Sequence, residues 1–142
     1  MPASTLIGYE AVASQRARLG VVSGQVQYQT ALRAGVAADR VWTFATQAAA
    51  IDALLAGAID AYASTLLGNR TLERQLAHEA LCAIEVKPSP HPIPVGAFSF
   101  AHDSVMLRRR FDTFLASYLG SPAHRQQVKA HGLSASEIDP VV

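Results

Sequence analysis

The first 87 residues alternate between short apolar runs and stretches in which apolar residues recur at helical spacing. The runs are rich in β-branched or aromatic residues and are bounded by glycine or polar residues, which is typical of strands. Strands are predicted at residues 19–24, 40–45, 58–64 and 81–86, and helices at residues 4–17, 26–34, 46–57 and 66–78. Connections of only a few residues favour parallel strands with helices on both faces. We therefore expect an α/β fold with a mostly parallel open sheet.

Residues 88–142 follow a different pattern. Proline occupies every second position from Pro88 to Pro94, so alternate backbone donors are missing and this segment cannot form a central strand. The elements predicted after it are a strand at residues 95–100, an amphipathic helix capped by Asp103 or Ser104 and ended by Gly120, a helix from Pro122 to His131 and a turn with a capping box from Ser134 to Glu137. We expect residues 1–87 to form the core of an α/β lobe, and residues 88–142 to add a proline-rich crossover, a strand and C-terminal helices to the same domain.

The composition is that of a folded and nearly neutral chain. Of the 142 residues, 50% are hydrophobic and 16% are charged, which excludes a disordered protein. Lys and Arg number 12 against 11 Asp and Glu, so the formal net charge of +1 provides no basic field for non-specific nucleic-acid binding. Cys82 is the only cysteine, which excludes an intramolecular disulfide and a cysteine-based zinc site.

Neither a membrane span nor a secretory signal is predicted. The longest apolar candidate, residues 48–58, is interrupted by Asp52 and is shorter than the roughly 20 residues that a span needs. The N-terminus lacks the positive region and apolar core of a signal peptide. We expect no membrane insertion, and a cytoplasmic location if the chain is the complete product.

Three segments, taken in order, resemble one known family. They are Leu19-Gly-Val-Val-Ser-Gly-Gln-Val-Gln, then Phe44-Ala-Thr-Gln-Ala-Ala-Ala-Ile-Asp-Ala-Leu-Leu-Ala-Gly-Ala-Ile-Asp-Ala-Tyr, and Gly96-Ala-Phe-Ser-Phe before a two-helix tail. Their order and spacing are similar to the second half of bacterial extracellular solute-binding proteins of the amino-acid type (family 3), the receptor components of ABC importers. The resemblance covers residues 19–138.

The resemblance implies the periplasmic-binding-protein type 2 fold, in which two α/β lobes close over a ligand, and this chain matches the second lobe. It further implies a small polar or zwitterionic ligand, an ABC permease as partner, and a periplasmic or extracellular location. The first lobe, which in the family supplies an aromatic platform and an arginine for the ligand carboxylate, has no counterpart in this sequence.

The turn after the first predicted strand is the first candidate for ligand binding. It leads into a helix N-terminus, where unpaired N–H groups and the positive end of the helix dipole favour a carboxylate. In the family this loop touches the ligand, often through a hydroxyl residue at the position of Val26, so here only backbone donors and Gln27 remain. The residues expected to bind the ligand are Val22, Ser23, Gly24, Val26 and Gln27. The alternative interpretation is a solvated turn.

Thr65 is the second candidate, because it follows the third predicted strand at its carboxyl end, where open α/β sheets place ligands. The family commonly has an aspartate there, which pairs with the ammonium group of an amino acid, whereas Thr65 offers only a hydroxyl. This difference favours a zwitterionic compatible solute such as ectoine over a standard α-amino acid, unless the site has decayed. Thr46 and Gln47 could line the same cleft, although Thr46 is also a natural N-cap.

Catalysis, a cofactor and a metal site are not predicted. The sequence shows no nucleophile motif, glycine-rich phosphate loop or acid/base carboxylate pair, and none of its 5 histidines forms an i, i+4 pair with another. Arg108, Arg109 and Arg110 are interpreted as the solvated face of an amphipathic helix. The broad apolar face of that helix predicts self-association into a homo-oligomer.

The function expected from these observations is solute binding by one half of an ABC-transporter substrate-binding protein. Two alternatives stay open. The first is an effector-sensing or protein-interaction domain, and the second is a truncated remnant without a ligand.

Overall fold

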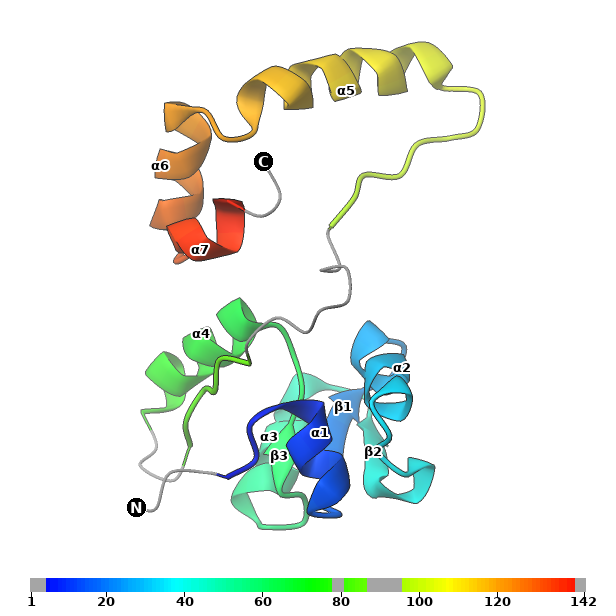
Figure 1. The fold of residues 1–142 in the computed structure, drawn as a ribbon, viewed down its shortest axis with the longest axis vertical. Coiled ribbons are helices and arrows are strands. Elements are labelled where there is room, and N and C mark those ends of the chain that lie inside the picture. Colours follow the sequence, from blue (N-terminus) through cyan, green and yellow to red (C-terminus); the bar gives the residue numbers. More distant parts are fainter. Residues whose placement is uncertain (1–4, 78–80, 87–95, 140–142) are drawn as a thin grey trace. The chain divides into compact units, whose positions relative to one another are not determined.

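Three parallel strands organise the first part of the chain. The computed structural model describes residues 5–77, 81–86 and 96–139 and separates two units, Met1–Lys87 and Pro88–Val142. The strands are β1 (Leu19–Val22), β2 (Val41–Phe44) and β3 (Ala61–Tyr62), in the spatial order β2-β1-β3. Leu19 is aligned with Val41 on one side and with Ala61 on the other. The first unit is therefore an α/β fold with a parallel open sheet, as the sequence predicts (Figure 1).

Helices precede and follow the strands in this unit. They are α1 (Gly8–Ser14), α2 (Val26–Arg33), the 3₁₀ helix η1 (Ala38–Arg40), α3 (Gln47–Leu55) and α4 (Leu66–Leu76). Thr46 caps α3, because its Oγ1 accepts a hydrogen bond from the Ala49 N–H at 3.2 Å, which confirms the predicted N-cap. Among the described residues, none of the helices has the length and apolarity that a membrane crossing needs.

The two faces of the sheet are covered by different helices. Strand alternation directs Leu19 and Val21 to one face, where they pack with Val12 of α1 and Ala31 of α2. A side chain at Gly20 would point to the opposite face, where Ile59 lies. Neither Ile59 nor the buried residues of α3 belong to the cluster around Leu19 and Val21. Helices thus lie on both faces, as predicted from the short connections.

The middle of β1 must be glycine because the far face is tightly packed. A Cβ atom built on Gly20 would lie 2.3 Å from Ile59 Cδ1 and 3.1 Å from Phe44 Cε2. Ile59 is only 1% exposed, so its side chain has little room to move aside. The close approach of α3 and its following turn to β1 therefore depends on the missing side chain.

Two predicted strands do not form, which corrects the sequence-based expectation. Residues 81–86 belong to no strand, and none of their backbone groups bonds to a described residue. The described part of the predicted strand at 95–100, residues 96–100, is likewise unpaired, and residue 95 lies outside the described residues. Apolar alternation gives a segment strand propensity, but a strand forms only where a neighbouring strand pairs with it.

The first predicted helix and the third predicted strand are much shorter than expected. The first helix spans Gly8–Ser14 rather than 4–17, because the positive φ angles of Gly8 (85°) and Arg16 (53°) interrupt the helix at its two ends; residue 4 lies outside the described residues. The predicted strand at 58–64 reduces to β3, since its ladder contacts run only to Leu19 and Gly20.

The second unit consists of α5 (Val105–Tyr118), α6 (Pro122–Ala130) and α7 (Ala135–Ile138). Ser121 caps α6 by accepting from the His124 N–H at 3.2 Å, and the predicted capping box of Ser134 and Glu137 opens α7. Aromatic rings extend from the segment before α5 to α6, with centroids 4.7 Å apart for Phe98–Phe111 and 5.2 Å apart for Phe114–Tyr118. The capping residues and apolar spacing in the sequence therefore predicted the positions of these helices correctly.

This unit has little core of its own. Of its described residues, Ile138 alone is buried. Phe98 is 67% exposed, Met106 70% and Leu107 57%, so the apolar face predicted for the amphipathic helix lies largely uncovered within the unit. Exposed apolar clusters of this kind usually mark a surface that contacts another molecule.

Replacing Gly20 with alanine tests the packing constraint on β1. Gly20→Ala is expected to lower the free energy of unfolding by about 1–3 kcal/mol, because the new methyl group overlaps Ile59. Gly96→Ala is the matched control, since a Cβ there meets nothing within 4 Å and the backbone φ is not positive. Urea unfolding of the full chain measures both variants. Equal stabilities of the two variants would contradict the packing argument.

Candidate functional site

The predicted ligand-binding residues follow the carboxyl ends of neighbouring strands. Ser23 and Gly24 come after β1, Thr46 comes after β2, and Thr65 comes after β3. Parallel strands end at the same edge of a sheet, and the Ser23 N–H donates to the Phe44 oxygen at 2.8 Å, which joins the first turn to the end of β2. The fold thus brings these separate segments to one edge.

The order of the strands reverses at this edge between β1 and β3. The chain leaves β1 through α2 on one face of the sheet and reaches β3 through α3 on the other face. In open α/β sheets such a reversal opens a crevice outside the carboxyl ends of the strands, and ligands bind there. Ser23 and Gly24 border this switch point from the β1 side, and Thr65 follows β3 on the other side.

The N-terminus of α2 keeps free hydrogen-bond donors. Its N-cap residue, Gln25, makes no side-chain capping bond, and the turn is opened by Gly24 with φ at 78°. Val26 is 60% exposed, so its backbone N–H lies at an accessible helix end. Val22 is half-buried at the end of β1 and contributes backbone rather than a polar side chain.

Gln27 differs from the other residues of this turn. Its side chain is half-buried, and its Oε1 is shielded from solvent without a hydrogen-bond partner among the described residues. Leaving a buried acceptor unsatisfied costs about 1–3 kcal/mol. A ligand N–H that reached this oxygen would remove that cost.

The two threonines act first as helix caps. Thr46 Oγ1 accepts from the Ala49 N–H, and Thr65 Oγ1 accepts from the Gly68 N–H at 3.1 Å. Both side chains are exposed, and each hydroxyl retains a proton that it can donate. The role of Thr65 as an N-cap was not predicted; it leaves the hydroxyl able to serve a ligand acceptor such as a carboxylate.

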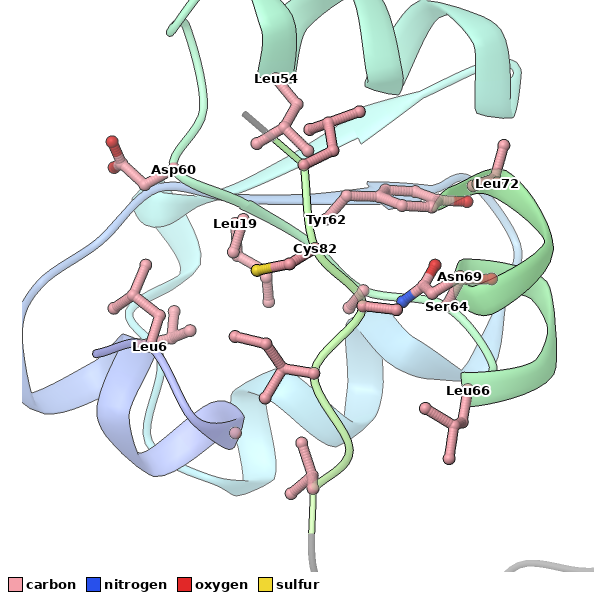
Figure 2. Close-up of a pocket in the computed structure, with 18 of the residues that line it drawn as sticks. Leu6, Leu19, Leu54, Asp60, Tyr62, Ser64, Leu66, Asn69, Leu72 and Cys82 are labelled. Atoms are coloured by element: carbon pink, nitrogen blue, oxygen red, sulfur yellow. The ribbon is translucent and has the colours of Figure 1, made fainter. Parts of the chain in front are cut away.

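A separate pocket of about 360 Å³ lies along the free edge of β3 (Figure 2). Side chains of α1, β1, α3, β3, α4 and the extended segment 81–86 line it, and most of them are apolar. None of the seven predicted ligand-binding residues belongs to its lining, although Ser64, the neighbour of Thr65, does. Sequence patterns gave no signal for this pocket, because its walls come from segments far apart in the chain.

Polar groups enter this pocket at a few points. Asn69 lies beside Ser64 in Figure 2, and its Oδ1 is buried without a hydrogen-bond partner among the described residues. Asp60 and Glu73 are the charged residues among the described lining, so the pocket carries acidic groups and no basic one. Cys82, which is exposed, directs its side chain into the same space.

Asp60 forms a bidentate ion pair with Arg18 at the amino-terminal end of the strands, away from the edge that holds the predicted ligand-binding residues. Arg18 Nη2 lies 2.7 Å from Asp60 Oδ1, while Arg18 Nε and the Arg18 N–H donate to Oδ2 at 3.0 and 2.8 Å. Hydrogen bonding to Arg18 lowers the pKa of Asp60. Burial of the carboxylate raises the pKa, but this effect is smaller, so the pKa stays below its ordinary value. The pair joins the start of β1 to the start of β3.

No group of three histidine, cysteine or acidic side chains that could hold a metal ion occurs in the described ranges. Comparison of the chain with protein-family models, with curated proteins and with solved structures finds no match. The geometry of the edge and the pocket therefore carries the functional argument.

The ion pair predicts how stability depends on pH. Because the pKa of Asp60 is lowered on folding, its contribution is complete above the ordinary value of 3.8 and is lost as the pH falls through the lowered value. Asp60→Asn is expected to reduce stability near neutral pH, and the difference from the wild type should vanish in strong acid. Asp52→Asn, an exposed α3 side chain without an ion pair in the described part, is the control and leaves stability nearly unchanged. Urea unfolding across the pH range gives the measurement, and a constant difference at all pH values would contradict the role of the pair.

Proposed function

We propose that the first unit binds a small polar solute bearing a carboxylate at the carboxyl edge of its sheet. The observation that carries the proposal is the reversal of strand order between β1 and β3, with the predicted residues at the ends of these strands. This position is where an open parallel sheet offers helix N-termini and loops to a ligand without disturbing the core.

The chemistry of the edge favours a ligand that is neutral overall. The N-terminus of α2 and the hydroxyls of Thr46 and Thr65 donate hydrogen bonds to a carboxylate. Gln27 Oε1 supplies the complementary acceptor for a ligand N–H. None of the predicted binding residues is acidic, so an α-ammonium group finds no charge partner among them. A zwitterion with delocalised positive charge, such as ectoine, suits this set better than a standard amino acid.

The resemblance of the sequence to solute-binding proteins supports the same function. In this proposal the chain forms one half of a ligand clamp that serves an ABC permease in the periplasm or outside the cell. The edge residues would close over the ligand from one side, and a second lobe would cover it from the other. No enzymatic step is part of the proposal.

A thermal-shift experiment on the full chain tests the proposal. Ectoine, amino acids and polyamines are added separately, and a carboxylate-bearing zwitterion is expected to raise the unfolding temperature. A ligand at about 100 times its Kd stabilises the folded state by about 2.7 kcal/mol, which such an experiment resolves easily. Absence of a shift with every zwitterion would refute binding at this edge.

A pair of matched variants locates the bound solute. Gln27→Leu removes the oxygen that accepts from the ligand N–H while keeping the side chain close to its original size, and is expected to weaken binding about tenfold. Gln29→Leu makes the same change on the exposed side of α2 and should leave the affinity unchanged. Isothermal titration of both variants gives the comparison. Equal losses in the two would place the ligand elsewhere.

A protein-interaction domain is the second candidate function, because the second unit exposes Phe98, Met106 and Phe114. It predicts a protein partner and no stabilisation by zwitterions, so the same thermal-shift experiment separates the two functions.

A further inference from the structure

The free edge of β3 carries backbone groups that lack a strand partner. Ala61 and Ala63 direct their N–H groups toward β1, where they donate to the oxygens of Arg18 and Gly20. Alternate residues of a strand point to opposite edges, so the N–H and C=O of Tyr62 face away from β1. Among the described residues, none bonds to these Tyr62 backbone groups. The pocket of about 360 Å³ lies along this same edge (Figure 2).

The second unit contains a strand-like segment whose backbone groups also lack hydrogen-bond partners among the described residues. Residues 96–100 alternate small and aromatic side chains and are not helical, but their backbone groups bond to no described residue. Phe98 touches the edge of Phe111, yet remains 67% exposed. The segment therefore has the composition of a strand, and its exposed backbone groups are available to pair with another strand.

We propose that residues 96–100 of a second copy of this chain add to the sheet at the free edge of β3 and place Phe98 and Phe100 in the pocket. Strand addition of this kind supplies the missing backbone bonds of Tyr62, while alternate side chains fill the adjacent pocket. Reciprocal exchange between two copies forms a closed dimer with the same contact made twice.

The size of the pocket fits two aromatic rings. A cavity of about 150 Å³ lined by apolar side chains accommodates one benzene ring. The pocket along β3 measures about 360 Å³, and its walls include Leu6, Leu19 and Leu72. Phe98 and Phe100 are two residues apart, so in a strand they point to the same side and can enter the pocket together.

Charges on the two surfaces are complementary. Asp60 in the pocket lining is already paired with Arg18, so Glu73 is the acidic residue of the described lining that forms no salt bridge with a described residue. The helix that follows the inserting segment begins with exposed Arg108, Arg109 and Arg110, none of which forms a salt bridge with a described residue. Attraction between the arginines of one copy and Glu73 of the other favours association, and salt weakens it.

Neighbouring segments of the same chain do not fill the pocket. Residues 81–86 already form part of its wall and make no backbone hydrogen bond to β3. The stretch after residue 86 has proline at positions 88, 90, 92 and 94, and therefore lacks the alternate N–H groups that pairing with Tyr62 requires. Residues 96–100 contain no proline and have both donors and acceptors free, so they are the better occupant of this edge.

Crosslinking through Cys82 tests which segment occupies the pocket. Cys82 is the only cysteine and lines the pocket, so a short bismaleimide should join it to a thiol introduced by Phe100→Cys in another copy. The expected product has the mass of a dimer and disappears when Cys82→Ser is added. Ser117→Cys, on the exposed side of α5, is the control and should give little crosslinked dimer. A product of monomer mass, or equal crosslinking of the control, would overturn the proposal.

Sedimentation over a range of protein concentrations provides the second test. Phe98→Ala removes a ring that is mostly exposed in the single chain, so the fold should persist while the Kd of the dimer rises about tenfold or more. Phe114→Ala removes a comparably exposed ring of α5, 54% exposed, and should leave the Kd nearly unchanged. A monomer at all concentrations refutes the proposal. The reverse ranking of the two variants would assign the interface to α5 and also refute it.

Discussion

Parallel pairing of β1 on both of its edges is the interaction on which the first unit depends. β1 places Leu19 and Val21 against α1 and α2, while Gly20 lets the opposite layer approach the backbone closely. Since neighbouring strands are parallel, each connection has to cross a face of the sheet through a helix. The same constraint therefore sets the two covered faces and gathers the loops that follow the strands at one edge.

Two kinds of surface result from this arrangement. At the carboxyl edge, a helix N-terminus, two capping hydroxyls and the unsatisfied Gln27 oxygen present mostly donors, which suits a small carboxylate. Along the free edge of β3, apolar side chains surround unpaired backbone groups, which suits an extended peptide. The two proposals, binding of a small solute and association between copies, therefore involve different parts of one sheet.

The limited extent of the sheet links several otherwise separate features. β3 ends the sheet after two paired residues, residues 81–86 lie near it unpaired, and residues 96–100 are an exposed strand-like segment in the other unit. In the proposed dimer, completing the sheet would supply backbone partners for Tyr62 and cover exposed aromatic side chains in the same step.

Sequence by itself determined the features that depend on near neighbours. Thr46, Ser121 and the Ser134–Glu137 capping box were predicted correctly because a cap involves residues three positions apart. The strands β1 and β2 and the parallel α/β class also followed, since a buried parallel strand has a nearly continuous apolar run. The predicted ligand-binding residues remain an expectation, although the fold places them at the ends of neighbouring strands.

Only the tertiary structure decided which apolar segments pair. Residues 81–86 and 96–100 have strand propensity, yet a strand requires a neighbour that local pattern does not specify. The Arg18–Asp60 pair joins positions 42 residues apart, and the shielded oxygen of Gln27 results from packing around α2. Such features depend on distances between remote parts of the chain, and those distances exist only once the sheet has formed.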